Sequence, residues 1–171
     1  MKLLKTIKDS DIFPELKTGI EVEEYKERKA ARAIIFDQEK NVAILNVSKS
    51  GYYKLPGGGV EEGEDMIEAL HRECIEEMGC SVKVEGEVGQ IIEYRNQNSL
   101  RQVSSCYTAR VDGSKGNPDF EQGEIDEGFQ GMWVTLDEAL DLMKQSKPTT
   151  YDGKFIMVRD SCFLEAVKAQ I

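Results

Sequence analysis

The sequence predicts an α/β protein in which helices cover both faces of a single β-sheet. Apolar stretches of strand length, such as Ala30–Asp37 and Val42–Val47, alternate with segments whose apolar residues recur at helical spacing. Strands followed by helices on both sides bury their apolar faces most simply as three layers. The 171 residues show no internal repeat, and this length suits one domain over residues 1–171. We therefore expect a single α/β/α layered domain.

The first 28 residues look like an extension of this domain. Short apolar patches in residues 1–20 are followed by the charged stretch EVEEYKER at 21–28. A charged, solvated strand is the simplest interpretation. A contact between two copies of the chain, giving a homodimer, and a wall of a binding pocket are the alternatives.

Strands and a glycine turn come next. Asp37–Asn41 forms the turn between the buried strands Ala30–Asp37 and Val42–Val47. Tyr52–Leu55 reads as a short strand that leads directly into Pro56 and three consecutive glycines. The glycines allow the backbone to turn tightly before the next element.

A helix is predicted over Asp65–Met78. Its apolar residues recur at three- and four-residue steps and would bury against the sheet. Gly79 follows as a plausible residue for ending the helix. Glu73 and Glu76 are expected to point away from the apolar stripe, with Glu77 at its border. The stripe consists of Ile67, Leu70, Cys74 and Met78.

The remaining elements follow from the same patterns. Thr135 is a predicted N-cap, with acidic residues in the turn after it. Asp112–Gly128 reads as a long loop rich in glycine and acidic residues, and such loops inside compact domains are often functional. We expect strands at 82–95, 102–111 and 129–134, a helix after Thr135, and a final helix at 155–169.

The composition restricts the partners of the chain. The net charge is −10 and the calculated pI is about 4.7, which argues against duplex nucleic acid because phosphate binding needs a basic face. No apolar run approaches the roughly 18 residues of a membrane span, and the N-terminus lacks the apolar core of a secretory signal. The four cysteines are scattered without a CxxC pair. We expect neither a zinc site nor a disulfide framework, and a reducing cytoplasm.

Three carboxylates on the predicted helix indicate a metal site. Glu73, Glu76 and Glu77 lie at i, i+3 and i+4, so they share one side of the helix. Like charges at this spacing destabilise a bare helix, whereas a hard cation such as Mg²⁺ binds such ligands. Because each side chain is expected to project from the apolar stripe, a substitution there should leave the fold intact and relieve repulsion.

The segment from Gly58 to Cys80 resembles the Nudix hydrolase box, G-x5-E-x7-R-E-U-x-E-E-x-G-U, in which U is a bulky apolar residue. Cys74 and Cys80 occupy the two U positions, and cysteine packs as a small hydrophobe. The resemblance to this MutT-like family implies a mixed β-sheet and Mg²⁺, or Mn²⁺, as cofactor. The fixed positions of the box are matched by Gly58, Glu64, Arg72, Glu73, Glu76, Glu77 and Gly79.

The resemblance also implies roles for individual residues. Arg72 would orient the carboxylates, and Glu64 would support the box. A further glutamate is expected from the loop before the strand that carries Trp133. We choose Glu127 for this role, with Glu124 second and Glu121 third, while a mobile solvated loop is the alternative. The metal would be held by Gly58, Glu73, Glu76, Glu77 and Glu127, and Glu76, Glu77 or Glu127 would act as the base.

The implied reaction is hydrolysis of a pyrophosphate bond in a nucleoside diphosphate linked to another moiety. The run LPGGGVEEGE hints weakly at ordinary or oxidised nucleoside triphosphates. Tyr53 could stack on a base and Lys54 could meet a phosphate, although core tyrosines are equally common. Two alternatives stay open: a silent nucleotide-binding module, and an isoprenoid diphosphate isomerase, which would need a catalytic cysteine such as Cys106.

Overall fold

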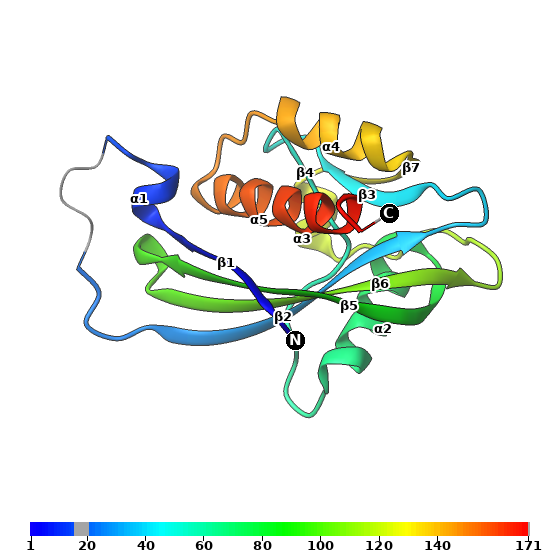
Figure 1. Ribbon diagram of the computed structural model, residues 1–171, viewed down its shortest axis with the longest axis horizontal. Coiled ribbons are helices and arrows are strands. Elements are labelled where there is room, and N and C mark those ends of the chain that lie inside the picture. The colour runs from blue at the N-terminus through cyan, green and yellow to red at the C-terminus, as the bar shows by residue number, and fades with distance from the viewer. Residues whose placement is uncertain (16–20, 171) are drawn as a thin grey trace.

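The computed structural model describes residues 1–15 and 21–170. One sheet separates two helical layers: α2 (Met66–Met78) covers one face, and α4 (Leu136–Gln145) and α5 (Tyr151–Lys168) cover the other (Figure 1). The shorter helices are α1 (Asp9–Ile12), α3 (Gln122–Asp126) and a 3-10 turn at Asn96–Asn98. The predicted α/β/α layering is confirmed.

The sheet is mixed. Its strands are ordered β1-β5-β6-β2-β3-β4, with β7 pairing β3. The pairs β1–β5 and β2–β6 are parallel, and the other pairs are antiparallel. The strands are β1 (Leu3–Lys8), β2 (Lys26–Phe36), β3 (Val42–Val47), β4 (Tyr52–Lys54), β5 (Ser81–Arg95), β6 (Leu100–Asp112) and β7 (Phe129–Val134).

The two apolar cores follow the strand period of two residues. Ile34 and Ile44 face the cluster beneath α4 and α5, which contains Phe155 and Phe163. Their neighbours along the same strands face the opposite cluster beneath α2: Ala33, Ile35, Ala43 and Leu45. Both faces of the central strands are therefore buried, which explains why these strands read as continuous apolar runs.

The structure corrects four of the predicted segments. The predicted N-terminal extension is part of the sheet, because Leu3–Lys8 pairs with β5, although residues 16–20 lie outside the described residues. The strand expected from Ala30 begins at Lys26. The loop expected over Asp112–Gly128 contains α3, and the last helix begins at Tyr151, where Thr150 caps it.

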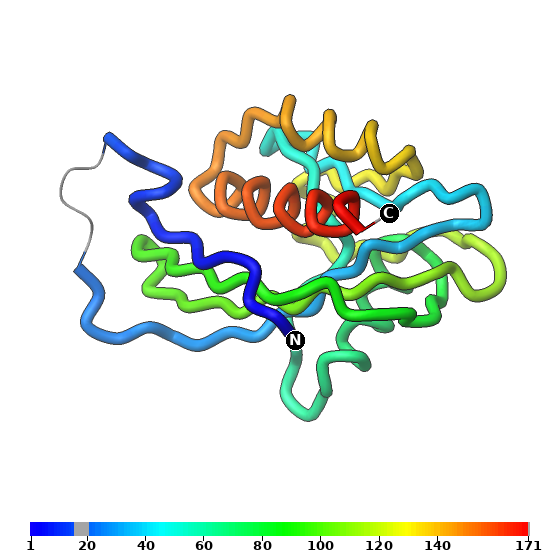
Figure 2. Tube along the Cα trace, in the orientation of Figure 1, coloured from blue at the N-terminus to red at the C-terminus, as the bar shows by residue number. Residues whose placement is uncertain are grey.

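The glycine loop after β4 extends the sheet where β2 and β3 part. The N–H groups of Ala31 and Ala33 donate to the carbonyls of Gly58 and Pro56, both at 3.0 Å. Gly57 has φ +127°, and a side chain there would overlap the Ala31 carbonyl, so only glycine fits this approach. Through this loop the chain crosses from the α4 and α5 side of the sheet to α2 (Figure 2). The loop is therefore held by the sheet itself.

Candidate active site

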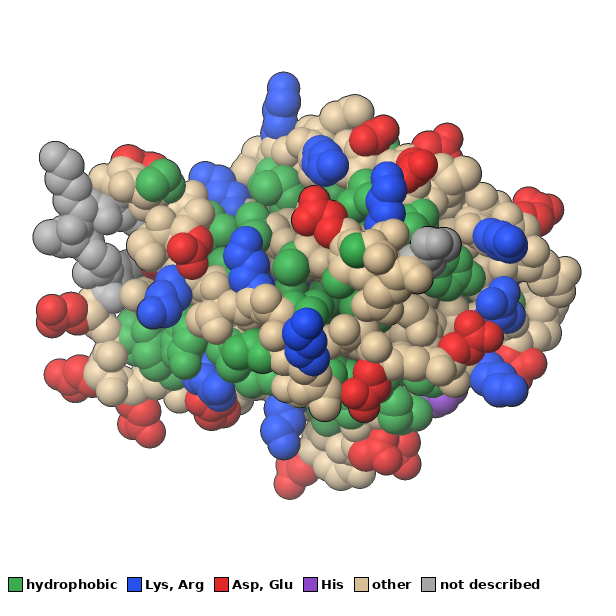
Figure 3. Space-filling view, viewed as in Figure 1, with side chains coloured by type: hydrophobic (Ala, Val, Ile, Leu, Met, Phe, Trp, Pro, Cys, Tyr) green, Lys and Arg blue, Asp and Glu red, His purple; other side chains and the backbone are tan. Residues whose placement is uncertain are grey.

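The two ends of α2 are fixed, and this fixes the direction of its glutamates. Asp65 caps the first turn by accepting from the N–H groups of Ile67 and Glu68, at 2.8 and 2.9 Å, and the Glu68 carboxylate accepts from Asp65 N–H. Gly79 ends the helix in the left-handed region, at φ +63°. Glu64 lies in the loop just before the Asp65 cap. Acidic side chains gather on the lobe formed by the loop before α2 and its first turns (Figure 3).

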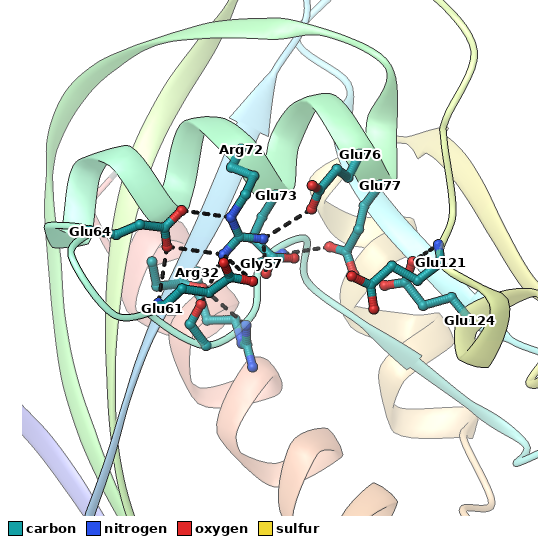
Figure 4. Close-up of polar contacts among 12 residues, drawn as sticks. Arg32, Gly57, Glu61, Glu64, Arg72, Glu73, Glu76, Glu77, Glu121 and Glu124 are labelled. Atoms are coloured by element: carbon teal, nitrogen blue, oxygen red, sulfur yellow. Dashed lines mark hydrogen bonds and ion pairs between the residues drawn. The ribbon is translucent and has the colours of Figure 1, made fainter.

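Arg72 lies at the centre of the box. Its Nε donates to Glu64 at 2.7 Å, and its Nη1 donates to Glu73 and Glu76 at 3.0 Å each (Figure 4). Its Nη2 donates to the Gly59 carbonyl at 3.1 Å. The Glu64 hydrogen bond, followed by those of the other carboxylates, raises the pKa of Arg72. The geometry is that of an orienting residue: one guanidinium aligns three carboxylates with the glycine loop.

Glu73 packs against the glycine loop. A side chain at Gly58 would overlap the Glu73 carboxylate, so glycine makes room for this acid beside the loop backbone. Burial, followed by the neighbouring charge of Glu77, raises the pKa of Glu73. A cation beside this carboxylate would offset both effects.

The structure corrects the prediction for Glu77. Its side chain does not project from the packing surface but is 1% exposed. One carboxylate oxygen lies 2.6 Å from Lys54 Nζ, and the other accepts from Gly57 N–H at 2.6 Å. Burial raises the pKa of Glu77, and the Lys54 ammonium opposes that rise. The buried face of α2 is thus wider than its apolar stripe. Glu76 is the most open of the three, with its side chain 33% exposed.

The two residues expected to bind substrate point to opposite faces of β4. Lys54 faces the box, where Glu77 and the Phe129 ring hold it. Tyr53 packs against the cluster beneath α4 and α5, and its N–H donates to Ser146 Oγ at 3.2 Å. The period of two along a strand places these neighbours on different sides. Tyr53 therefore does not reach the box.

The structure brings different loop glutamates to the box than the one we chose. Glu121 and Glu124 line a hollow of about 320 Å³ together with Glu73 and Glu76. They precede and enter α3, three residues apart, and so share one side of it (Figure 4). The Glu127 carboxylate instead accepts from Ser50 Oγ at 2.5 Å. A possible sequence signal was the spacing E-x-x-E at 121–124, which forms a capping box.

The loop before α3 is docked on α2. Gly116 N–H donates to the Gly79 carbonyl and Asp119 N–H to the Glu76 carbonyl, both at 2.7 Å. A side chain at Gly79 would overlap the backbone of Asn117, so this glycine serves both the helix end and the docking of the loop. Upstream, Lys115 contacts Asp37 and the Trp133 ring. These contacts tie the loop to α2 and to the turn that follows β2.

The residues around the hollow are suited to a hard cation. Five carboxylates face only two arginines there, and the space beside Gly58 lets Glu73 lie against the loop backbone. Among the described residues, no group of three acidic, histidine or cysteine side chains converges tightly enough to chelate an ion in this arrangement. Oxygen donors in this number still match the ligand preference of Mg²⁺. The hollow is lined by Arg28, Gly59, Val60, Glu61, Arg72, Glu73, Glu76, Glu121 and Glu124.

Comparison with known proteins identifies the family. The model of the NUDIX domain matches residues 26–153, which is most of the chain, and the chain therefore belongs to this family. The match begins at the first residue of β2 and ends within α5. It contains the box, the docked loop and the strands from β2 to β7.

Two curated relatives and one solved structure illustrate the relationship. The chain is 32% identical to an RNA pyrophosphohydrolase of Wolbachia pipientis subsp. Culex pipiens (strain wPip) over 95 residues, which cover 54% of this chain and 57% of that protein. It is 28% identical to diphosphoinositol polyphosphate phosphohydrolase 3-alpha of Mus musculus over 124 residues, 71% and 72% of the two chains. The chain thus spans little more than half of the first relative.

The solved structure supports the fold alone. A NUDIX hydrolase from Nitrosomonas europaea superposes with a TM-score of 0.64 at 19% identity, over 85% of this chain and 90% of that one. Within the described part of the chain, no helix has both the length and the apolar character to cross a membrane. The cysteines are all free thiols.

Proposed function

We propose that this protein hydrolyses a pyrophosphate bond with the help of Mg²⁺ or Mn²⁺. The observation that carries the proposal is the arrangement around Arg72, which aligns Glu64, Glu73 and Glu76 beside a hollow that Glu121 and Glu124 face. The relatives named for pyrophosphohydrolase or phosphohydrolase activity support the same reaction class. The substrate would be a diphosphate linked to another moiety, as in a nucleoside diphosphate derivative.

The residues of the box and the docked loop would have three different roles: binding the cation, positioning the glycine loop and accepting a proton. Glu73, Glu76, one or both loop glutamates and the Gly58 carbonyl would hold the cation, which when bound neutralises the diphosphate and lowers the pKa of water. Lys54 and Gly57 N–H hold Glu77, so it would chiefly position the glycine loop beside that cation. The groups placed to accept a proton from attacking water are the more open carboxylates: Glu76, Glu121 and Glu124.

The two alternative functions are less well supported. A silent binding module would not need five carboxylates around one hollow, and here all box carboxylates are present and oriented. An isomerase would need an accessible cysteine at the site. Cys106 is fully buried in the cluster beneath α5, and burial raises the pKa of its thiol well above the usual value. A cytoplasmic location, with its thiols reduced, remains our expectation.

Metal dependence is the first test. Activity on a panel of nucleoside triphosphates, ADP-ribose and diphosphoinositol phosphates should disappear in chelator and return with Mg²⁺ or Mn²⁺, because unneutralised carboxylates repel a diphosphate. Release of phosphate or pyrophosphate measures it. Full turnover of any of these substrates in chelator would contradict the proposed mechanism.

Substitutions in the docked loop are the second test. Glu121→Gln or Glu124→Gln should lower kcat at least about tenfold, because each removes a carboxylate that faces the box. Glu127→Gln, a matched change three residues from Glu124, should retain kcat within about twofold, because this exposed residue contacts Ser50 and does not line the hollow. Loss of activity only in Glu127→Gln would restore the residue chosen from sequence and reject the arrangement seen here.

A further inference from the structure

A second hollow lies at the end of the sheet where α1 sits beside the hairpin of β5 and β6 (Figure 1). It has a volume of about 500 Å³, which falls within the range of small-molecule sites, roughly 300–1,000 Å³. Its walls come from β1, the start of α1, Tyr25 just before β2, and the end of β5 with the turn that follows. It shares no lining residue with the carboxylate hollow. A ligand here would therefore leave the box free.

A buried carboxylate without a cationic partner lines this hollow. Asp9 is 5% exposed. Its Oδ1 accepts from Asn96 N–H at 3.3 Å and from the Tyr151 hydroxyl, and both donors are neutral. Within residues 1–15 and 21–170, Asp9 forms no ion pair. Because buried charges are normally paired with an opposite charge, this carboxylate is suited to a cation that enters the hollow.

Two tyrosine rings form a corner in the same hollow. The centroids of the Tyr25 and Tyr94 rings lie 5.2 Å apart, and their planes meet at 77°. The Tyr25 hydroxyl donates to Asn96 Oδ1 at 2.9 Å, which fixes the first ring. The Arg101 guanidinium packs over the second, 5.8 Å from the Tyr94 centroid. Aromatic faces attract ammonium groups, above all when these are alkylated, so the corner and the carboxylate favour the same kind of ligand.

Lys8 opposes a cation in this hollow. It is one of the lining residues, it is exposed, and in the described part of the chain it has no carboxylate partner. Water and salt screen an exposed ammonium, whereas the buried carboxylate of Asp9 is screened much less. The attraction by Asp9 should therefore exceed the repulsion by Lys8. Substitutions at these two neighbours should then change the affinity for a cation in opposite directions.

We propose that this hollow binds the alkylammonium group of a small molecule, with the Asp9 carboxylate as its counter-ion and the rings of Tyr25 and Tyr94 as its aromatic walls. A divalent metal ion fits this site less well, because it prefers several oxygen ligands, and Asp9 is the single acid among the described lining residues. The inference does not rest on the proposed function, because the two hollows are separate.

Charge at constant shape is the decisive comparison. Choline would be titrated into the full chain beside its uncharged carbon analogue, in which a tert-butyl group replaces the trimethylammonium group. Shifts of the backbone amide NMR signals around Asp9 and Asn96 would report binding. Choline should bind at least about tenfold more tightly than the analogue, because only choline gains the carboxylate and the ring faces as electrostatic partners. Its affinity should fall as salt rises.

Variants assign the effect to the residues named. Asp9→Asn should bind choline at least about tenfold more weakly, because it keeps an acceptor but loses the charge. Tyr25→Leu should bind it about fivefold more weakly, whereas Tyr25→Phe keeps the ring and should stay within about twofold. Lys8→Gln should bind it more tightly. The matched control is Asp11→Asn, an exposed acid of α1 outside the hollow, which should stay within about twofold.

Three results would overturn the inference. These are no binding of choline, equal binding of choline and its uncharged analogue, and wild-type affinity in Asp9→Asn at an unchanged melting temperature. If Asp9→Asn does not fold, because Asp9 also holds Tyr151, the other two positions decide. Weaker binding in Tyr25→Leu together with tighter binding in Lys8→Gln supports the site, and wild-type affinity in both rejects it. Each result is independent of whether the chain hydrolyses a diphosphate.

Discussion

Replacing Glu77 with glutamine should both abolish turnover and lower the free energy of unfolding by about 3 kcal/mol. The carboxylate is 1% exposed and lies 2.6 Å from Lys54, whose side chain is 10% exposed. Removing one partner of such a pair leaves the other charge buried without compensation. The same change weakens the acceptor for Gly57 N–H and so loosens the loop that carries Gly58. We expect kcat to fall at least about a hundredfold.

Two control variants separate the effect of the buried ion pair on stability from the effect of the carboxylate on activity. Glu76→Gln, whose side chain is one-third exposed, should lose activity to a similar extent while stability changes by less than about 1 kcal/mol. The double change Lys54→Met/Glu77→Leu should recover much of the lost stability without activity, because apolar side chains often replace a buried ion pair at no cost. Denaturant unfolding and steady-state kinetics measure both. Wild-type stability in Glu77→Gln would show that the pair contributes nothing, as expected for projecting side chains.

The sequence predicts the helices and strands of this site better than it predicts which of their side chains are buried. Arg72 and Gly79 are recognisable because box spacing and helix termination depend on local chemistry. The burial of Glu77 cannot be recognised in the same way, since apolar periodicity places charged residues outside the core. Burial of Glu77 depends on Lys54, 23 positions away along the chain. Such a pairing is a property of the packed layers.

The direction of the loop glutamates could not be predicted from the sequence for a related reason. Within a loop, no sequence pattern predicts which way each of three glutamates within seven residues points. The short helix α3 gives them one, turning Glu121 and Glu124 toward the box. Docking of the preceding loop on Gly79 and Glu76 then fixes the distance of α3 from α2. The family resemblance implied that the loop supplies a glutamate, and in the structure Glu121 and Glu124, but not Glu127, line the hollow beside the box.

A buried charge network behind the box was not predicted at all. Arg159 and Asp160 of α5 are both fully buried beside Glu93 of β5. Arg159 donates to Asp160 at 2.7 Å and to Glu93 at 3.3 Å, and Arg95 donates to Glu93 at 2.7 Å. Burial alone would raise the pKa of Glu93, but the two arginines hold it below its usual value. Charged residues on a buried helix face are invisible to apolar periodicity.

This network supports the glycine loop from the opposite side of the sheet. Asp160 accepts from Leu55 N–H at 2.8 Å, immediately before Pro56 and the glycines. The carboxylate therefore ties α5 to the start of the loop that positions Gly58 and Glu73. Asp160 is a positioning residue, because it acts on the box only through Leu55.

Replacing Asp160 with alanine should lower the free energy of unfolding by about 3–5 kcal/mol, since it strips Arg159 of its nearest anion and leaves Leu55 N–H without its acceptor. Asp160→Asn keeps an acceptor for Leu55 and should retain more kcat than Asp160→Ala at equal folded fraction. Asp152→Asn removes a half-exposed partner of Arg95 and should cost less than about 1 kcal/mol. Urea unfolding would give the stabilities. The value of kcat, measured well below each melting temperature, would show whether the glycine loop is still correctly positioned. Asparagine can offer an acceptor to Leu55 N–H or to Arg159, and alanine to neither, so equal kcat in the two variants would show that neither contact of this side chain positions the box.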